Sequence, residues 1–336
     1  MPIPIEKLQA VKNVVVHDAC PDGLASAMIL RACYSTAEVK FVQYDTKAHR
    51  ELEAQPNTIF ADFSPHRDRV DDFKRAEAIV LDHHKTQKDV VGSFGELGVF
   101  GDEATEPGVS GAVLAFREVW WPLMKEKAAP MMSDVVRGLD LTNSPTKDFR
   151  LIQDFATLAG IRDTWQTKSP RWQESCEQAA AMFFWPPEVL LPVPPDKWAE
   201  KLSLGPLLLE KQLKRAKRNA DSSFRFTSTK GTRVAVFEGT TSASDAAEYL
   251  HESVDLVVGF DIFVQDGQPV MLWSIRSHTD FDCGTFCKAH GGGGHLRAAG
   301  FKLILQPDDP NPFALARRVL DAYESASGRV DGTPNG

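Results

Sequence analysis

Acidic and imidazole side chains gather at the ends of three apolar segments in the first hundred residues. They are His17, Cys20 and Asp22 after the first segment, Asp62 after the second, and Asp82, His83 and His84 after the third. Carboxylate oxygens mixed with imidazole nitrogens suit divalent ions of the Mn²⁺ type. Two such ions about 3.5–4 Å apart can clamp a phosphoryl group and activate water against it. The pattern therefore predicts a two-metal site for phosphoryl chemistry.

A purely structural interpretation of these residues has to be weighed against the chemical one. A single Asp after a strand, such as Asp62 taken alone, is usually a helix cap or a turn residue. The Asp-His-His triplet is harder to explain in this way. Adjacent histidines point to opposite faces of a strand, so at least one of them needs polar partners. Three clusters at three strand ends together favour a functional site.

The elements around these clusters predict a parallel sheet. Strands are expected at 14–17, 39–45, 58–63 and 78–84, with helices at 24–33 and 70–76. This βαβ alternation implies parallel strands joined by right-handed crossovers. The carboxyl ends of such strands share one edge of the sheet, where open α/β sheets place their ligand sites. We therefore expect the three clusters to meet there.

The rest of the chain predicts a helical region and then a second α/β pattern. Residues 110–185 are expected to be mostly helical, and the proline-rich segment 185–198 marks an inter-domain region. A connecting helix follows at 201–223. Strands at 233–239, 255–264 and 269–277 then accompany a helix at 244–252 that a serine, Ser244, is expected to cap.

We accordingly predict an α/β protein of two domains with the active site in the cleft between them. The N-terminal domain, with a mainly parallel sheet, is joined by a linker helix to a smaller α/β domain. The boundaries are 1–190 for the catalytic domain, 191–222 for the linker and connecting helix, 223–325 for the substrate-binding domain, and 326–336 for a disordered tail. A length of 336 residues also favours two hydrophobic cores over one.

A run of four glycines, Gly291 to Gly294, begins the segment GGGGHLRAAGF. Consecutive glycines allow positive φ angles and can turn several N–H groups inward. Such a nest binds anions, phosphate above all. The alternative is a flexible turn without a ligand. His295 and Arg297 follow directly, which favours phosphate binding.

Composition narrows the class of protein further. Apolar residues make up 43% and charged residues 25%, as in ordinary globular proteins, and no apolar run is long enough to cross a bilayer. Five scattered cysteines and no recognisable signal peptide predict a reduced, cytoplasmic protein. The net charge of −8 argues against binding of long duplex nucleic acid. We expect a short or small phosphate substrate and no membrane partner.

With these motifs in view, the chain resembles the DHH phosphoesterases. That family includes single-strand exonucleases of the RecJ kind, nanoRNases and cyclic-dinucleotide phosphodiesterases. HDACPDG, FAD around Asp62 and VLDHH match its first three motifs in order. AGIRDTW is similar to the fourth and points to Asp163, with Asp140 in LDLTNS as the rival. GGGGHLRAAGF, preceded by WSIRS, resembles the hallmark of the DHH-associated domain.

The resemblance implies a role for each site residue. The implied metal ligands are His17 on the first ion, Asp22, His83 and Asp163 on the second, Asp62 bridging both, and Asp82 as a ligand or as an orienter of His83. His84 would face the scissile phosphate, and Asp62, Asp82 and His84 are the predicted catalytic residues. The implied substrate-binding residues are Arg276, Ser277, Gly291, Gly292, Gly293, Gly294, His295 and Arg297.

Cys20 departs from the family pattern, which usually has an Asp at this position. A thiolate is softer than a carboxylate and favours Zn²⁺, Fe²⁺ or Co²⁺ over Mg²⁺. Cys20 is therefore a candidate ligand of the first ion. The alternative is a small residue beside an ion held by other groups, because buried Cys is common without a function. The expected cofactor remains a pair of divalent ions. Mn²⁺ is the leading candidate, and a softer ion is the alternative.

The sequence therefore predicts a metal-dependent phosphoesterase that acts on phosphodiester bonds of short oligonucleotides or dinucleotides. One alternative is a phosphomonoesterase or polyphosphatase that acts on a small phosphate such as adenosine bisphosphate. A second alternative, from another class, is a nucleotide-binding module without catalysis. The sequence leaves the oligomeric state open.

Overall fold

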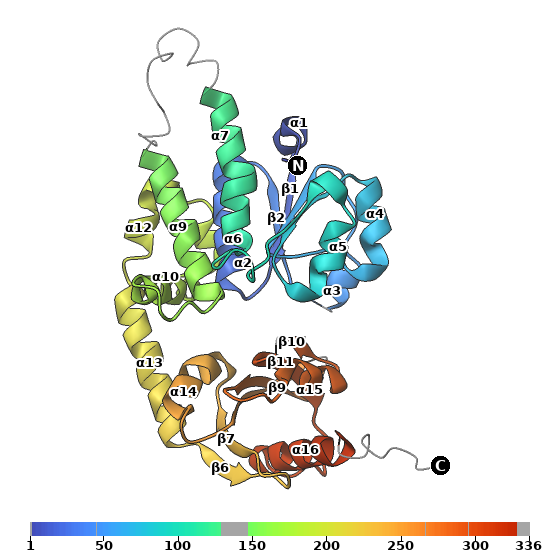
Figure 1. Ribbon diagram of the computed structural model, residues 1–336, viewed down its shortest axis with the longest axis vertical. Helices are drawn as coiled ribbons and strands as arrows, with labels where there is room; N and C mark the ends of the chain where they lie inside the picture. The colour runs from blue at the N-terminus through green and yellow to red at the C-terminus, as the bar shows by residue number, and fades with distance from the viewer. Residues whose placement is uncertain (1, 45, 129–146, 266, 295, 328–336) are drawn as a thin grey trace. The chain divides into compact units, whose positions relative to one another are not determined.

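The computed structural model describes residues 2–44, 46–128, 147–265, 267–294 and 296–327. The chain forms two compact units, Met1–Leu209 and Glu210–Gly336, each built around its own sheet (Figure 1). Both units contain helices and strands, so the predicted α/β class is confirmed.

Unit 1 contains a five-stranded sheet in which every neighbouring pair is parallel. Its strands are β1 (Asn13–His17), β2 (Glu38–Val42), β3 (Thr58–Ala61), β4 (Ile79–Asp82) and β5 (Gly98–Phe100). The spatial order β2-β1-β3-β4-β5 reverses direction between β1 and β3. This is the topological switch point, outside which open α/β sheets bind their ligands.

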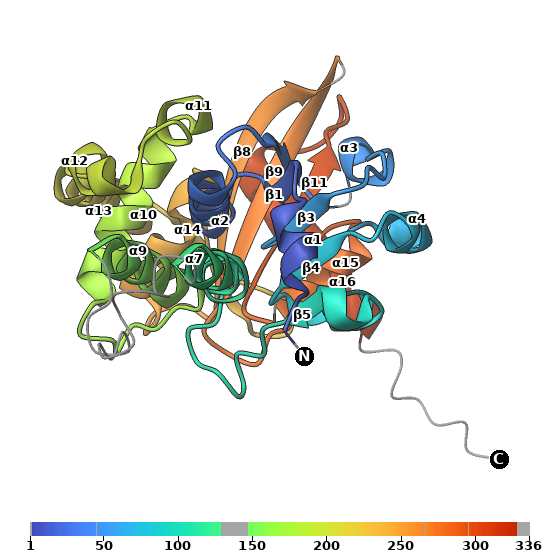
Figure 2. The same ribbon diagram turned by 90° about the horizontal axis from the view of Figure 1, so that it is seen from above.

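Helices cover both faces of this sheet, because alternate strand residues point to opposite sides (Figure 2). Val14 and Val16 enter a core shared with α2 (Pro21–Cys33), α6 (Gly111–Leu114) and α9 (Lys147–Asp163). Val15 enters a second core on the opposite face, with α4 (Val70–Arg75) and α5 (Lys88–Gly92). Two short helices, α1 (Ile5–Gln9) and α3 (Lys47–Arg50), complete this part of the unit.

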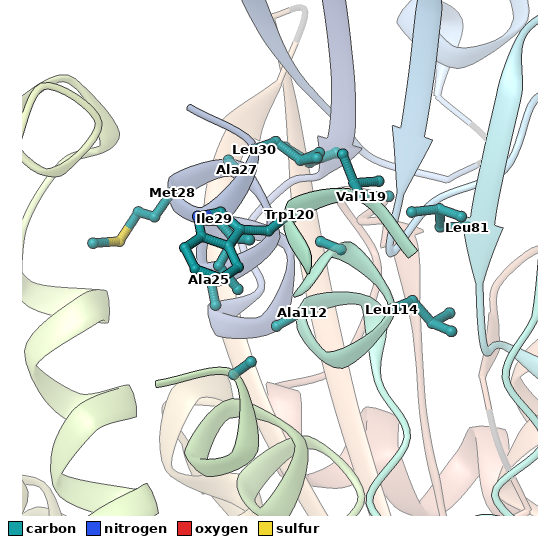
Figure 3. Close-up of a cluster of buried hydrophobic side chains, with 14 of the residues drawn as sticks. Ala25, Ala27, Met28, Ile29, Leu30, Leu81, Ala112, Leu114, Val119 and Trp120 are labelled. Carbon is teal, nitrogen blue, oxygen red and sulfur yellow. The ribbon is translucent and has the colours of Figure 1, made fainter. Parts of the chain in front are cut away.

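The larger of the two cores surrounds α2, whose small and aliphatic side chains pack against α6 and the sheet (Figure 3). A π-helical stretch, Ala115–Trp120, continues α6 into α7 (Trp121–Ala128). Ala25, Ile29 and Leu114 are completely buried in this core, and Trp120 is nearly so. Burial of each large aliphatic side chain contributes about 1.5–3 kcal/mol, and this packing holds α2 and α6 against the sheet.

The proline-rich segment packs with unit 1. It follows α10 (Trp172–Phe184) and contains α11 (Pro187–Leu190) and the start of α12 (Trp198–Lys201). Leu190 and Trp198 are buried in the same core as α2. The predicted connecting helix is α13 (Gly205–Asp221), within which the two units meet along the chain. The domain boundaries after residues 190 and 222 stay predictions.

Unit 2 contains a six-stranded mixed sheet in the order β10-β11-β9-β8-β7-β6. Its strands are β6 (Phe224–Thr227), β7 (Arg233–Glu238), β8 (Leu256–Gln265), β9 (Gln268–Ser277), β10 (Gly293–Gly294) and β11 (Ala298–Ile304). β7 and β8 are parallel, and the other neighbouring pairs are antiparallel. The helices are α14 (Ala243–Leu250), α15 (Cys283–Ala289) and α16 (Pro312–Ser327). Trp273 and Phe286 are completely buried in the core beneath α15 and α16.

Two details of unit 2 differ from the sequence predictions. α14 begins at Ala243, so Ser244 lies inside its first turn and does not cap it. The Ser244 hydroxyl instead accepts a hydrogen bond from Arg276 Nε at 2.8 Å. α16 extends to Ser327, two residues into the predicted tail, and the remainder of that tail lies outside the described residues.

Within the described part of the chain, no helix has both the length and the apolar character needed to span a membrane.

Candidate metal centre

The carboxyl ends of β1, β3 and β4 bring the three predicted clusters to one edge of the sheet. His17 is the last residue of β1, Asp62 follows β3, and Asp82 is the last residue of β4 with His83 directly after it. β1 and β3 are neighbours on either side of the switch point. His17 and Asp62 therefore face each other where the topology leaves room for a ligand.

Asp62 lies at the middle of the cluster and is completely buried. Its Oδ2 is 3.6 Å from His17 Nδ1, and its Oδ1 is 3.1 Å from His83 Nε2. The backbone at Asp62 has a φ of +57°, a left-handed conformation that costs about 1–2 kcal/mol outside glycine. A Cβ added at Gly111 would lie 2.3 Å from Asp62 Cβ, so only glycine fits there. Strain and close packing together aim one carboxylate oxygen at each histidine.

His17 presents a lone pair to Asp62. Its Nε2 is 2.8 Å from Gln43 Oε1, and when Nε2 donates to that oxygen, Nδ1 of the neutral ring is an acceptor. Nδ1 and Asp62 Oδ2 are both buried without a hydrogen-bond partner. In the neutral ring two lone pairs would face each other in a buried site, and either a proton on Nδ1 or a metal ion between the two atoms would compensate them. Burial opposes protonation of His17, but the nearby charge of Asp62 outweighs it and raises the pKa of His17.

His83 lies among three carboxylates. Its Nε2 is 3.1 Å from Asp62 Oδ1, 3.3 Å from Asp163 Oδ2 and 3.9 Å from Asp22 Oδ2. One ring N–H cannot serve three carboxylates, whereas a divalent ion can. Burial and the like charges of Asp62 and Asp163 raise the pKa of Asp22 well above its usual range, as expected for a carboxylate in a buried acidic cluster.

Asp22 also joins the cluster to the start of α6. Its Oδ1 accepts hydrogen bonds from Ser110 Oγ at 2.7 Å and from Ala112 N at 3.2 Å, and its Oδ2 accepts one from Gly111 N at 2.6 Å. Each carboxylate oxygen has two lone pairs, so these bonds leave capacity for a metal. The bonds hold Asp22 in one orientation beside His83.

Asp82 is held entirely by protein donors. Its Oδ1 accepts from His83 N, His84 N and His84 Nδ1 at 2.8, 3.1 and 2.7 Å. Its Oδ2 accepts from Tyr44 Oη at 2.8 Å and Ser64 Oγ at 2.6 Å. Asp82 thus contacts the ring of His84, whereas the resemblance implied a contact with the ring of His83. Burial opposes protonation of His84, but the charge of Asp82 outweighs it and raises the pKa of His84 to about 9.

Three groups of side chains within the described residues have ligand atoms close enough together to hold an ion. They are His17–Cys20–Asp62, Asp62–His83–His84 and Asp22–His83–Asp163, and within each group the ligand atoms lie within 4.8 Å of one another. Asp62 and His83 each belong to two groups. The donors and the unpartnered atoms of His17 and Asp62 fit divalent metal ions. Asp82 is in none of these groups, and the rival Asp140 lies outside the described residues.

Sequence reasoning missed the residues that support the cluster: Gln43, Tyr44, Ser64 and Ser110. Gln43 and Tyr44 directly follow β2 at the same sheet edge, so their position in the chain was a usable signal. Ser110 precedes Gly111 and accepts a hydrogen bond from Val113 N as the N-cap of α6, for which serine is a favoured residue type. Ser64 carries no signal in the sequence apart from its closeness to Asp62.

The predicted substrate-binding residues gather where β9, β10 and β11 pair in unit 2. Arg276 pairs with Ala298 across the sheet, and its guanidinium donates to Ser244 Oγ, Ser274 Oγ and Ile275 O. Ser277 is buried and its hydroxyl is bonded to Thr279. Arg297 is exposed, and His295 lies outside the described residues.

The glycine run differs from expectation in detail. Positive φ angles occur at Gly291 (+78°) and Gly294 (+140°), and not at Gly292 or Gly293. Gly292 is required for another reason, because a Cβ there would lie 2.1 Å from Gly300 O. Close strand packing thus explains part of the run.

Comparison with known proteins identifies the fold but no near relative. No protein-family model matches the chain, and no curated protein matches it significantly. Among solved structures, a DHH domain described as a member of a family of ribosomal proteins matches with a TM-score of 0.54 and 12% identity, over 96% of this chain and 87% of that one.

Two further structures match over most of the chain with lower TM-scores. CDC45 from Entamoeba histolytica gives 0.48 at 9% identity, over 96% of each chain. A pGpG-specific phosphodiesterase, PggH, from Vibrio cholerae gives 0.35 at 14% identity, over 95% of this chain and 99% of that one. Of these three, the first has a TM-score above 0.5, and the fold assignment depends on it.

Proposed function

Because the chain has the DHH-type fold, we propose that it is a divalent-metal-dependent phosphoesterase that hydrolyses phosphodiester bonds of short oligonucleotides or dinucleotides. One observation carries the proposal: Asp62 is buried at the topological switch point with Oδ2 toward His17 and Oδ1 toward His83. A carboxylate so placed can bridge two ions, and a two-metal site of that kind stabilises both the attacking and the leaving oxygen of an in-line displacement at phosphorus.

The donors divide into two positions that share Asp62. The first position is His17, Cys20 and Asp62, and the second is Asp22, His83 and Asp163 together with Asp62. When bound there, two divalent ions, for which Mn²⁺ is the leading candidate, supply the positive charge that activates water and neutralises the phosphoryl oxygens. The distances from His83 Nε2 to Asp62 Oδ1 and Asp163 Oδ2, 3.1 and 3.3 Å, support the second position.

The remaining residues of the centre hold one another in position and stabilise charge in the transition state. Asp82 holds the His84 ring through Nδ1, and Tyr44 and Ser64 hold Asp82. The charge of Asp82 raises the pKa of His84 to about 9, and a protonated ring would carry a positive charge that can steady the phosphoryl oxygens as negative charge builds in the transition state. The hydrogen bonds to Asp82 fix this ring before substrate arrives, and preorganisation of this kind lowers the barrier.

We assign substrate anchoring to unit 2. The turn at Gly291–Gly294, with Arg276 and Arg297 close in the same part of the sheet, would bind a terminal phosphate. Anchoring by one terminal phosphate suits an enzyme that acts from the end of a short substrate. The net charge of −8 is consistent with this choice, because a long duplex needs a basic surface.

The test is a substrate screen of Mn²⁺-loaded protein. Di- to pentaribonucleotides, cyclic dinucleotides, adenosine bisphosphate, polyphosphate and a long duplex are incubated separately, and products are resolved by chromatography. Mononucleotides released from the short diesters are expected. Release of phosphate from adenosine bisphosphate or polyphosphate alone would replace this proposal by the monoesterase alternative. Nucleotide binding without turnover in a protein that holds two ions would replace it by the binding module.

A further inference from the structure

Cys20 lies at the turn between β1 and α2, directly beside the first metal position. It is the N-cap residue of α2, a helix of 13 residues. The turn is tight: Ala19 has a φ of +54°, and a Cβ at Gly23 would lie 2.2 Å from His17 O. This geometry folds the chain back on β1 and brings Cys20 Sγ within 4.8 Å of ligand atoms of His17 and Asp62.

A second observation at the same place points to an ion independently of the cysteine. His17 Nδ1 and Asp62 Oδ2 are buried, lack a hydrogen-bond partner and lie 3.6 Å apart. The Asp62 side chain is 1% exposed. Asp62 and the sulfur belong to the same group of converging ligand atoms. Three donors of different kinds, nitrogen, oxygen and sulfur, thus converge, and one divalent ion would satisfy all three.

The two metal positions differ in chemical softness. The second position offers one nitrogen of His83 and carboxylate oxygens of Asp62, Asp163 and Asp22 at 3.1, 3.3 and 3.9 Å from it, a set that suits Mn²⁺. The first position adds a sulfur, and thiolate ligands select Zn²⁺, Fe²⁺ and Co²⁺ over the harder ions. A bound divalent ion also deprotonates a thiol that coordinates it.

We propose that the Cys20 thiolate is a ligand of the first ion, with His17 and Asp62, and that this position selects a borderline ion such as Zn²⁺, Fe²⁺ or Co²⁺ while the second position keeps its preference for Mn²⁺. The centre is then heterometallic, with Asp62 bridging two unlike ions. The inference rests on the proposed function, because it assigns the ions that the same site would hold.

Cobalt(II) provides a direct test, because thiolate coordination produces a sulfur-to-cobalt charge-transfer absorption that oxygen and nitrogen ligands do not produce. Metal-free full-length protein is titrated with Co²⁺ under reducing conditions, and bound cobalt is counted separately by elemental analysis. The variants are Cys20→Ser and Cys20→Asp, with Cys33→Ser as the matched control at the far end of the same helix. Serine and aspartate are favoured N-cap residues, so α2 is preserved in both variants.

The charge-transfer band is expected in the wild type and in Cys33→Ser, and absent from both Cys20 variants. One equivalent of Zn²⁺ should abolish the band, whereas one equivalent of Mn²⁺ should not. Cys20→Asp should reduce the preference of the first position for Zn²⁺ over Mn²⁺ by at least about tenfold, since even residues outside the coordination shell affect metal affinity by that factor.

The two levels of inference fail differently. If cobalt binds in stoichiometric amount without the charge-transfer band, Cys20 is not a ligand and the heterometallic centre is wrong, while the proposed phosphoesterase stands. If no cobalt binds to wild-type protein that is folded by circular dichroism, the metal centre itself is wrong. A band that persists in Cys20→Ser would assign the thiolate to another cysteine and also overturn the inference.

Discussion

Asp62 concentrates the chemistry of the site in one side chain. The sheet edge, the left-handed backbone and the contact with Gly111 leave its two oxygens pointing to different histidines. An ordinary turn aspartate would be exposed or would cap a helix. Burial of a carboxylate among Asp22 and Asp163 costs free energy unless cations compensate it. Divalent metal ions at the proposed site would supply that compensation.

Replacement of Asp62 by Asn should separate catalysis from folding. Asn keeps the size and tolerates a φ of +57°, but its amide nitrogen cannot ligate a metal. We expect fewer ions bound and a turnover reduced more than about hundredfold, because loss of a bridging ligand exceeds the 10–100-fold effect of outer residues. Metal analysis and kcat are the measurements. The control is Asp18→Asn in the turn after β1, where the side chain is exposed and bonded to Ala19 N. Equal effects of the two variants would contradict the bridging role.

Tyr44 should act as a positioning residue through Asp82. Tyr44→Phe removes the hydroxyl that donates to Asp82 Oδ2 and accepts from Ser64 N. We expect kcat to fall roughly ten- to hundredfold with KM little changed, and stability to fall by about 1–3 kcal/mol. Tyr34→Phe is the matched control, because its hydroxyl donates to Leu8 O away from the site. Stability is measured by urea denaturation and activity by steady-state kinetics. Equal activity in the two variants would show that Tyr44 has a purely structural role.

The sequence predicted the residues that carry charge at the site but not those that hold them. His17, Asp22, Asp62 and His83 were identifiable because acids and imidazoles after apolar strands are unusual, and Asp163 because AGIRDTW is similar to the fourth motif of the DHH family. Tyr44 and Ser64 are common residue types whose role depends on contacts 38 and 18 positions away along the chain. Such contacts exist only after the sheet has formed, so no local pattern in the sequence predicts them.

At the scale of elements, the start of α6 is as important to the site as any strand. Its first residues donate to Asp22, and its glycine allows the helix to approach Asp62.

The βαβ pattern predicted the strands and α2 well, because each has a clear apolar period. The fifth strand, Gly98–Phe100, has three residues and was not predicted. The role of Ser244 was also mistaken, because its tertiary partner Arg276 is 32 residues away.

Gly111→Ala should damage the site through the backbone. The added methyl group would lie 2.3 Å from Asp62 Cβ and 2.7 Å from Asp62 Cα, so either α6 or Asp62 must move. We expect a loss of about 1–3 kcal/mol from overpacking, together with weaker metal binding. Gly92→Ala is the control, since nothing lies within 4 Å of a Cβ there. Denaturation midpoints and metal titrations measure both effects. Full metal affinity in a destabilised Gly111→Ala variant would show that α6 does not position Asp62.

The glycine turn of unit 2 can be tested by its backbone angles. Gly291 has a φ of +78° with open space around it, so Gly291→Ala strains the turn by about 1–2 kcal/mol without a clash. Gly231→Ala, in a turn outside the glycine run, has a φ of +92° with open space around it, so it imposes similar strain and is the control. We expect KM for a 5′-phosphorylated dinucleotide to rise in the first variant and stay unchanged in the second. Unchanged KM in both would show that the turn does not bind phosphate.

At the scale of the whole molecule, charge and topology point to a small substrate. The chain has a net charge of −8, yet the proposed site must attract phosphate. In the proposed site that positive charge is local, because divalent ions, the His84 ring and a few arginines of unit 2 would supply it. The sequence predicted this contrast from composition alone, because net charge requires no fold. It could not show where each positive charge lies, since that depends on which strands become neighbours.

Salt dependence should therefore be shallow. For single strands, log affinity falls with log salt at a slope of about −0.7 per phosphate contacted. Contact with two or three phosphates predicts a rise in KM of less than about twentyfold between roughly 50 and 200 mM salt, against 10³–10⁵-fold for a protein that contacts 6–10 phosphates. KM should also stop falling with substrate length once the substrate exceeds a few nucleotides. The measurement is KM against salt for ribonucleotides of increasing length. A steep slope that grows with length would reveal an extended basic groove, which an acidic chain with a local anchor does not provide.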